Sequence, residues 1–375
     1  MKKFLIALCT TIPFLTSGCN NGNSTNSNNT ATVSALTLNQ MNTDNIQECF
    51  DSSDNLVSNP TAINSNGIVT GFVPSGSNCV HHGYIWGQQE SNFVTLPNPI
   101  DAIDNFYSSA ISDNIVTAGN TDFHSNRFGG YVTNNIGYPL GGTFSSLSAN
   151  GIYITFNNGE NFASGILNVS TNEKTIIDNN IVNNEQSLLY SVSNNGTAVG
   201  VTMDDEDVYP IICHGNQCSE ISNFDKNLLS GGLVAISSNS NYIYGQYTIG
   251  DDNNNQLFSV NPQTQEMTDI SLPVGFFIKA NTIVTDEGVT IVEDRRSDDD
   301  IREYVFIPQT NQIYSVHDII EKLGLQQITE GASLSPNGKY MIIKTYGYSV
   351  LAYKIYFNNG IASWLSANIN QTQPE

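Results

Sequence analysis

Three runs of acidic residues hold the densest cluster of carboxylates in the sequence. Each run lies between two strand-like stretches, in which apolar residues either alternate with polar ones or follow one another. This pattern places each run in a loop between strands. Carboxylate oxygens are the ligands that hard cations prefer, so these loops could bind Ca²⁺ or a cationic partner surface. No run has the alternating spacing of a Ca²⁺-binding loop, so we favour solvated loop tips, expect no cofactor and keep Ca²⁺ as the alternative. The residues are Asp204, Asp205, Glu206, Asp207, Asp251, Asp252, Asp298, Asp299 and Asp300.

Sequence signatures of common catalytic sites are absent. The chain has no Gly-x-Ser-x-Gly elbow, phosphate-binding loop, His-Glu-x-x-His or Ser-x-x-Lys. A glycoside hydrolase or lyase needs two suitably placed acids, roughly 5–10 Å apart in hydrolases. Asp113, Asp286 and Glu287 are the acids at blade turns that could serve, but we expect them on the face opposite the acidic loops.

Six cysteines occur, and four of them suit a disulfide framework. Cys213 and Cys218 bracket a turn-like tetrapeptide between two strand-like runs, which places them opposite each other across a hairpin. A metal site of Cys213, His214 and Cys218 is the alternative, although no fourth ligand is evident. Cys49 and Cys79 are then left to pair with each other.

The elements that carry these residues form an internal repeat. A strand, a tight turn and a second strand recur, with the second turn residue at positions 67, 114, 151, 196, 240, 288 and 338. The spacing matches the roughly 40–50 residues of a four-stranded propeller blade. Asn-Gly pairs at four of the marks predict two-residue hairpins with positive φ at both central positions. The fold class is therefore all-β, a β-propeller of seven four-stranded blades, with six or eight blades as alternatives.

Two further strand-like runs follow most of these hairpins. In the seventh unit they are residues 350–357 and 361–365. One helix is predicted between the sixth and seventh units. It begins with Asp318 as its cap, continues through Glu321 and Leu323, and stops at Gly324.

The N-terminus has the pattern of an export signal. Lys2 and Lys3 precede the apolar residues 4–14, a run too short to cross a bilayer. Ser17 and Gly18 before Cys19 resemble the lipobox of bacterial lipoproteins, which implies lipidation at Cys19; ordinary signal cleavage is the alternative. The domain boundaries expected are residues 1–18 for the signal, 19–32 for a lipidated flexible tether, 33–61 for an N-terminal segment docked on the ring, 62–366 for the propeller and 367–375 for a tail.

The net charge of −22 limits the partners of this protein. An acidic domain repels nucleic acid and anionic lipid, so we expect no nucleic acid partner and a membrane contact through the lipid anchor only. Asn20 after the lipidation site resembles the pattern of lipoproteins sorted to the outer membrane. The expected location is therefore the outer membrane, facing the periplasm or the cell surface.

The first repeat also resembles a known family. Residues 62–71, followed by His82-Gly83-Tyr84-Ile85-Trp86, are similar to the HAF-type repeat of bacterial extracellular proteins. Gly83 and Tyr84 replace the Ala and Phe of that repeat, and the His and Trp recur in no other unit. The resemblance implies a secreted, propeller-like array and supplies no catalytic residues.

Two hypotheses for function follow. The first is a non-catalytic binding or scaffold module that presents its loops to a protein or glycan partner, in an oligomeric state that the residues do not indicate. The second is a propeller-type carbohydrate-active enzyme, a glycoside hydrolase or lyase with carboxylates at the central channel.

Overall fold

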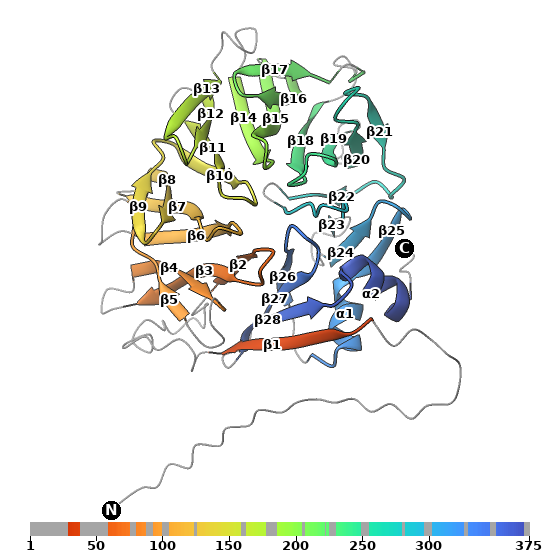
Figure 1. Ribbon diagram of the computed structural model, residues 1–375. Helices are drawn as coiled ribbons and strands as arrows, with labels where there is room; N and C mark the ends of the chain where they lie inside the picture. The colour runs from red at the N-terminus through yellow and green to blue at the C-terminus, as the bar shows by residue number, and fades with distance from the viewer. Residues whose placement is uncertain are drawn as a thin grey trace, which may run out of the picture.

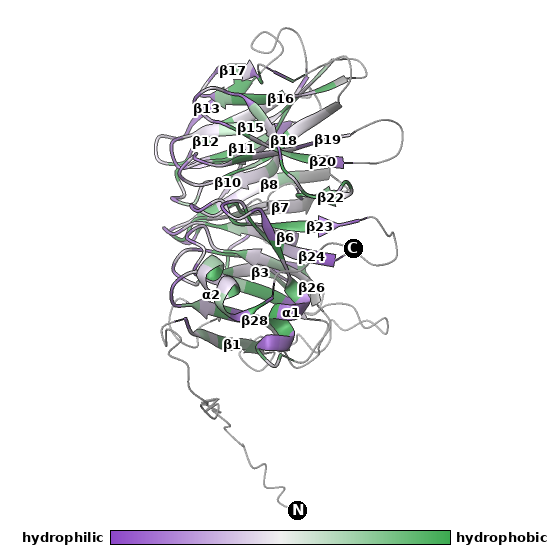
Figure 2. Cartoon of the chain, turned by 90° about the vertical axis from the view of Figure 1, so that its right-hand side faces the viewer, coloured by the Kyte–Doolittle hydropathy of each residue, from purple (hydrophilic) through white to green (hydrophobic). Residues whose placement is uncertain are grey.

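Seven four-stranded antiparallel sheets form a closed ring around a central channel (Figure 1). This computed structural model describes residues 29–37, 59–75, 80–87, 93–99, 105–123, 126–158, 163–177, 186–204, 207–221, 223–224, 230–248, 255–279, 282–295, 302–325, 329–345 and 350–370. Each sheet is one blade of a β-propeller, and the described residues add two short helices. Viewed from the side, the ring is a thick disc (Figure 2). The predicted all-β, seven-bladed propeller is confirmed.

In the first four blades the strands follow chain order from the channel outwards. Their bounds are β2 (Asn59–Ile63), β3 (Val69–Ser75), β4 (Val80–Trp86) and β5 (Phe93–Thr95); β6 (Asn105–Ile111), β7 (Thr117–Phe123), β8 (Asn126–Thr133) and β9 (Ile136–Pro139); β10 (Thr143–Leu147), β11 (Tyr153–Asn158), β12 (Ala163–Asn168) and β13 (Glu173–Ile177); and β14 (Gln186–Val192), β15 (Thr197–Asp204), β16 (Asp207–His214) and β17 (Gln217–Glu220).

The fifth and sixth blades repeat this order, and the seventh departs from it. The fifth contains β18 (Ser230–Ile236), β19 (Ile243–Thr248), β20 (Asn255–Val260) and β21 (Met267–Asp269); the sixth contains β22 (Phe276–Phe277), β23 (Thr290–Asp294), β24 (Arg302–Ile307) and β25 (Gln312–Ser315); the seventh contains β26 (Thr329–Leu334), β27 (Tyr340–Thr345), β28 (Val350–Phe357) and, from the other end of the chain, β1 (Ala31–Thr37).

The outer strand of the seventh blade closes the ring. β1 runs antiparallel to β28, with Ala31 opposite Phe357 (Figure 1). The prediction of a strand at residues 361–365 was wrong, because this segment belongs to helix α2 (Ile361–Asn368). Gly360, at φ 82°, turns the chain out of the sheet, and Ile361, Trp364 and Leu365 then present one buried helical face.

The predicted helix between blades six and seven is confirmed as α1 (Val316–Lys322). Its cap is Ser315 rather than Asp318, because the Ser315 side chain accepts hydrogen bonds from the backbone N–H groups of His317 and Asp318. Asp318 instead lies in the first turn, where a negative charge complements the helix dipole. Both helices pack into one apolar cluster with the last two blades.

The hairpins that mark the repeat differ from the prediction in one respect. In the first blade the Gly67 N–H donates to Asn64 O, and of the turn residues 64–67 only Gly67 has positive φ, at 73°. In all seven blades the N–H of the fourth turn residue donates to the C=O of the first. Each hairpin is therefore a turn that ends in one left-handed residue, and not a two-residue loop. The residue that opens each turn is fully buried: Asn64, Ser112, Ser148, Ser193, Ser237, Thr285 and Ser335.

These turns are joined to each other around the ring, and we call them the turn belt (residues 64–67, 112–115, 148–151, 193–196, 237–240, 285–288 and 335–338). Hydrogen bonds link every neighbouring pair and return from the seventh blade to the first. They run from Ser65 N to Asp113 Oδ1, Asp113 N to Ala149 O, Asn150 N to Asn194 Oδ1, Asn194 N to Ser238 O, Ser238 Oγ to Asp286 Oδ1, Asp286 N to Pro336 O and Asn337 Nδ2 to Ser65 O. The belt defines the turn face of the disc, and the connections between second and third strands define the opposite loop face.

Candidate functional site

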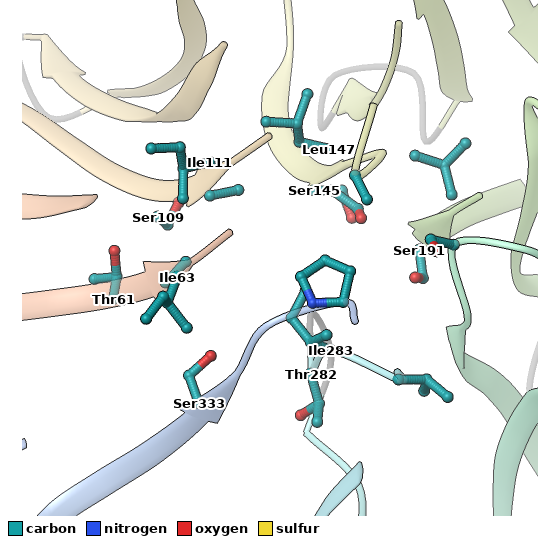
Figure 3. Close-up of a pocket in the computed structure, with 18 of the residues that line it drawn as sticks. Thr61, Ile63, Ser109, Ile111, Ser145, Leu147, Ser191, Thr282, Ile283 and Ser333 are labelled. Atoms are coloured by element: carbon teal, nitrogen blue, oxygen red, sulfur yellow. The ribbon is translucent and has the colours of Figure 1, made fainter. Parts of the chain in front are cut away.

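The central channel is lined by the inner strand or inner segment of every blade. Six of the seven inner strands contain a register shift, which in β2, β6 and β10 falls at Thr61, Ser109 and Ser145. A bulge leaves one residue outside the ladder and redirects its side chain. In Figure 3 these three hydroxyl side chains lie around the open centre of the ring, together with Ser191, Thr282 and Ser333.

A cavity of about 80 Å³ occupies the turn end of the channel. Its described lining consists of serine and threonine hydroxyls, aliphatic groups, Phe144 and Pro336. Ala149, Ser238 and Pro336 bring turn-belt residues into this wall. The chemistry that such a wall offers is hydrogen bonding to neutral polar groups alongside apolar contact.

A second cavity, of about 160 Å³, adjoins the first on the side of blades six and seven. The two share Thr61, Thr282, Ile283 and Ser333 in their walls. The second cavity is charged, since Lys279, Glu293, Glu303 and Lys344 line it. It lies towards the loop face. Strand β23 runs from the turn belt to the loop face and Glu293 is near its end, and β24 starts at the loop face with Glu303 near its beginning.

The two glutamates lie opposite each other in the register of β23 and β24. Lys279 Nζ contacts Glu293 Oε1 and lies 3.5 Å from Glu303 Oε1. The glutamate side chains are 3% and 13% exposed, whereas that of Lys279 is 51% exposed. One half-exposed ammonium therefore bridges two largely buried carboxylates.

Both carboxylates are also held by other donors. Arg295 donates from Nε and Nη2 to Glu293 Oε2, at 2.9 and 2.7 Å. The Ala332 N–H of blade seven donates to Glu303 Oε2 at 2.7 Å. These hydrogen bonds fix the two side chains whether or not Lys279 is in place.

Burial raises the pKa of Glu303 above its ordinary value, Lys279 opposes that shift, and the neighbouring Glu293 adds to it. Glu303 can therefore take up a proton more readily than an exposed glutamate. The arrangement can hold a cation or exchange a proton at the edge of the channel.

The structure describes little of the predicted acidic loops. Asp204 ends β15 and Asp207 begins β16, and the two are backbone partners in the ladder. The first of these loops therefore joins the second and third strands, as predicted. The other seven candidates lie outside the described residues: Asp205, Glu206, Asp251, Asp252, Asp298, Asp299 and Asp300.

The acids considered for an enzyme are not brought together. Asp113 and Asp286 belong to blades two and six, and each accepts a hydrogen bond from the preceding blade's turn. Glu287 is exposed beside Asp286. Sequence reasoning missed Glu293 and Glu303, and the only local signal was an acid that directly follows the apolar pair Ile291-Val292 in a strand, Thr290–Asp294, that the structure shows to be buried throughout.

The predicted disulfide between Cys213 and Cys218 is present. The two residues are partners across the β16–β17 hairpin, with Cα atoms 4.0 Å apart. Cys19, Cys49 and Cys79 lie outside the described residues, so their lipidation and pairing stay predictions.

The described ranges contain neither a metal-binding cluster of side chains nor a membrane-spanning helix. No group of three or more His, Cys, Asp or Glu side chains there is placed to hold a metal ion. No helix among those residues has the length and apolar character needed to cross a membrane.

Comparison with known proteins shows the fold. No protein-family model and no curated protein sequence matches the chain. An oligogalacturonate lyase from Vibrio parahaemolyticus has a similar structure, with a TM-score of 0.53, 9% identity and coverage of 88% of this chain and 98% of that chain. An oligogalacturonate lyase in complex with manganese gives a TM-score of 0.52 at 10% identity, with the same coverage of both chains.

A third similar structure belongs to a study of two prolyl endopeptidases. Its TM-score is 0.53 at 11% identity, and the alignment covers 80% of this chain but 50% of that one. At such low identities the similarity establishes the propeller fold alone, and the activities of these proteins do not transfer to this chain.

Proposed function

We propose that this protein is an exported, lipid-anchored binding module of the outer membrane, whose channel holds a polar segment of a glycan or protein partner without chemical change. The export signal, Cys19 and the HAF-type resemblance of the first repeat support the location. The Cys213–Cys218 disulfide also supports it, because such bonds persist in oxidising compartments.

The observation that carries the proposal is the lining of the first cavity. Hydroxyls from several blades converge there, among them Thr61, Ser109 and Ser191, with aliphatic side chains between them. Sugar rings and peptide segments combine polar edges with apolar faces, and binding sites for them combine a few placed hydrogen-bonding groups with an apolar wall.

The turn belt supports the same function. Seven blades hydrogen-bonded in a closed circuit hold the cavity wall in one geometry before a ligand arrives. A preorganised wall binds more tightly because less side-chain and loop entropy is lost on association.

One observation favours the enzymatic alternative. Glu293 and Glu303 form a buried acid pair at the channel, with the pKa of Glu303 raised. A carboxyl with a raised pKa is suited to general acid catalysis on a glycan. Product formation from a uronate or neutral glycan panel, lost in Glu303→Gln, would favour the enzyme over the binding module.

The channel is tested by blocking it. Ser109 is exposed in the cavity wall, so Ser109→Trp should fill the space with little effect on the fold. Thr268→Trp, on the exposed outer strand β21, is the matched control. On glycan and peptide arrays we expect Ser109→Trp to lose about tenfold or more of the binding that Thr268→Trp keeps. Equal binding by both variants would exclude the channel as the site.

The location is tested separately from the ligand. Cys19→Ser should move the protein from the membrane fraction to the soluble fraction and abolish labelling with a radioactive fatty acid. Protease digestion of intact cells would place the ring at the surface, and protection until lysis would place it in the periplasm.

A further inference from the structure

We propose that the charged cavity between blades six and seven recognises a primary ammonium group of the ligand, and that Lys279 occupies this site until the ligand displaces it. The inference rests on the proposed binding function and names the ligand chemistry of the adjoining part of the channel. It is carried by the arrangement of Glu293, Glu303 and Lys279 around one cavity.

Lys279 is suited to be displaced. Its ammonium lies between the two carboxylates, yet half of its side chain is exposed, so it can move into solvent without opening the core. Exposed lysines hold their salt bridges weakly, because water competes and a flexible side chain must be immobilised. Exchange for a ligand ammonium therefore costs little on the Lys279 side, and the position that the lysine leaves is already shaped for an ammonium group.

The carboxylates are suited to remain. Arg295 fixes Glu293 through two hydrogen bonds, and the Ala332 N–H fixes Glu303. Gly331 lines the same cavity, and a Cβ there would lie 3.3 Å from Glu303 Oε1, so glycine leaves this oxygen uncrowded. Both acceptor oxygens therefore keep their positions when the lysine departs.

A cation is then favoured in its place. Two buried carboxylates that face each other across strands repel one another, and burial without a partner charge is costly. Arg295 contacts Glu293 and Lys344 also lines the cavity, whereas the described ion pair of Glu303 is with Lys279, so an incoming ammonium would take over the contact that Lys279 makes with both carboxylates. The net charge of −22 would raise the local concentration of a cationic ligand near the ring.

The ammonium could belong to an amino sugar or to the N-terminus of a peptide. The recognition chemistry is the same, and the experiment distinguishes the two sources. The probes are the glucosamine trimer and a trialanine peptide, each compared with its N-acetylated form, which keeps the sugar rings or the peptide chain, adds an acetyl group at each amine and loses the charge. Binding is measured by calorimetry at low ionic strength with the whole protein.

The central variant is Lys279→Met, which removes the resident ammonium and keeps most of the length of the side chain. We expect it to bind at least one free-amine probe about tenfold or more tightly than the unaltered protein, with no gain for the N-acetylated form. Lys279→Arg keeps a cation in the cavity and should show no comparable gain. Adding Glu303→Gln to Lys279→Met should reverse the gain, and near-UV circular dichroism checks the fold of every variant.

Several results would overturn the inference. Equal gains for free and N-acetylated probes would show a steric effect of Lys279 and no ammonium recognition, and no gain for either probe would remove the site. Tight binding of Ca²⁺ by Lys279→Met without amine selectivity would assign the acid pair to a metal ion. Failure of the channel hypothesis is distinguishable, because Ser109→Trp would then leave every binding curve unchanged while the Lys279→Met gain persisted.

Discussion

The turn face and the loop face of this ring use acidic residues in opposite ways. On the turn face, Asp113 and Asp286 accept hydrogen bonds from neighbouring blades and are part of a closed circuit of seven turns. Towards the loop face, Glu293 and Glu303 are more deeply buried, and the side chain that bridges them, Lys279, is half exposed. Carboxylates in the first region maintain the architecture, whereas those in the second are available for exchange.

The largest effect should come from crowding the turn belt. Gly151 has φ 73°, and a Cβ there would lie 2.5 Å from Ser112 Oγ of the preceding blade. Gly215 has φ 60°, and a Cβ there would meet no described atom within 4 Å. Gly215→Ala is therefore a control that adds backbone strain without a steric clash. We expect Gly151→Ala to lower the free energy of unfolding by about 2 kcal/mol more than Gly215→Ala, measured by urea denaturation. Equal losses of unfolding free energy in the two variants would mean that the turn belt rearranges locally to accommodate the added methyl group.

A smaller effect should follow the loss of one link in the belt. Asn194→Ala removes the Oδ1 that accepts from Asn150 N at 2.8 Å. We expect a loss of about 1 kcal/mol in the free energy of unfolding, since one partly buried donor loses its partner. Gln217→Ala, at an exposed position of the β16–β17 hairpin, is the control. Ligand binding by Asn194→Ala should be unchanged, and a loss of binding would contradict the division between the two faces.

The smallest effect on stability is expected at the acid pair, and it depends on pH. The pKa of Glu303 in the folded protein is raised from its ordinary value of 4.5, so the folded state binds this proton more tightly than the unfolded state. The stability that this contributes is complete below pH 4.5 and is lost as the pH rises through the raised pKa. Glu303→Gln cannot ionise, so its unfolding free energy should fall less over that range.

The control for this pH series is Glu266→Gln, which changes an exposed carboxyl on the hairpin between β20 and β21. Its profile of unfolding free energy against pH should follow that of the unaltered protein. If Glu303→Gln also follows that profile, burial does not perturb Glu303, and the contrast between the two faces is weaker than the structure indicates.

The blades could be predicted from the sequence because their signals are local. A segment such as Ser335-Pro336-Asn337-Gly338 contains the buried hydroxyl, the turn and the left-handed residue of one hairpin within four positions. Seven such segments at a regular spacing are sufficient to predict a propeller. The sequence did not predict the exact turn geometry, because an Asn-Gly pair suits two kinds of turn. One has positive φ at both residues, and the other, which the structure shows, has positive φ only at the glycine, as at Gly67.

Ring closure and the charged cavity depend on distant parts of the chain, and the sequence did not reveal them. Residues 361–365 are as apolar as a strand, and they become a helix because β1 already fills the edge beside β28. Glu293 and Glu303 become partners only through the register of β23 and β24, and Lys279 reaches them from outside that hairpin. No local sequence pattern indicates contacts between residues this far apart.

The pairing of β1 with β28 also fixes the order in which this chain can mature. Ala31 is among the first described residues to be synthesised, and its partner Phe357 is among the last. Contacts between such distant positions form slowly, since the entropy of closing the long intervening chain must be overcome first. Six blades can assemble while the seventh is still unfinished, and the polypeptide becomes a closed ring only after its C-terminal region is available. A nascent chain would therefore remain an open array of blades until the residues that form β28 have been synthesised.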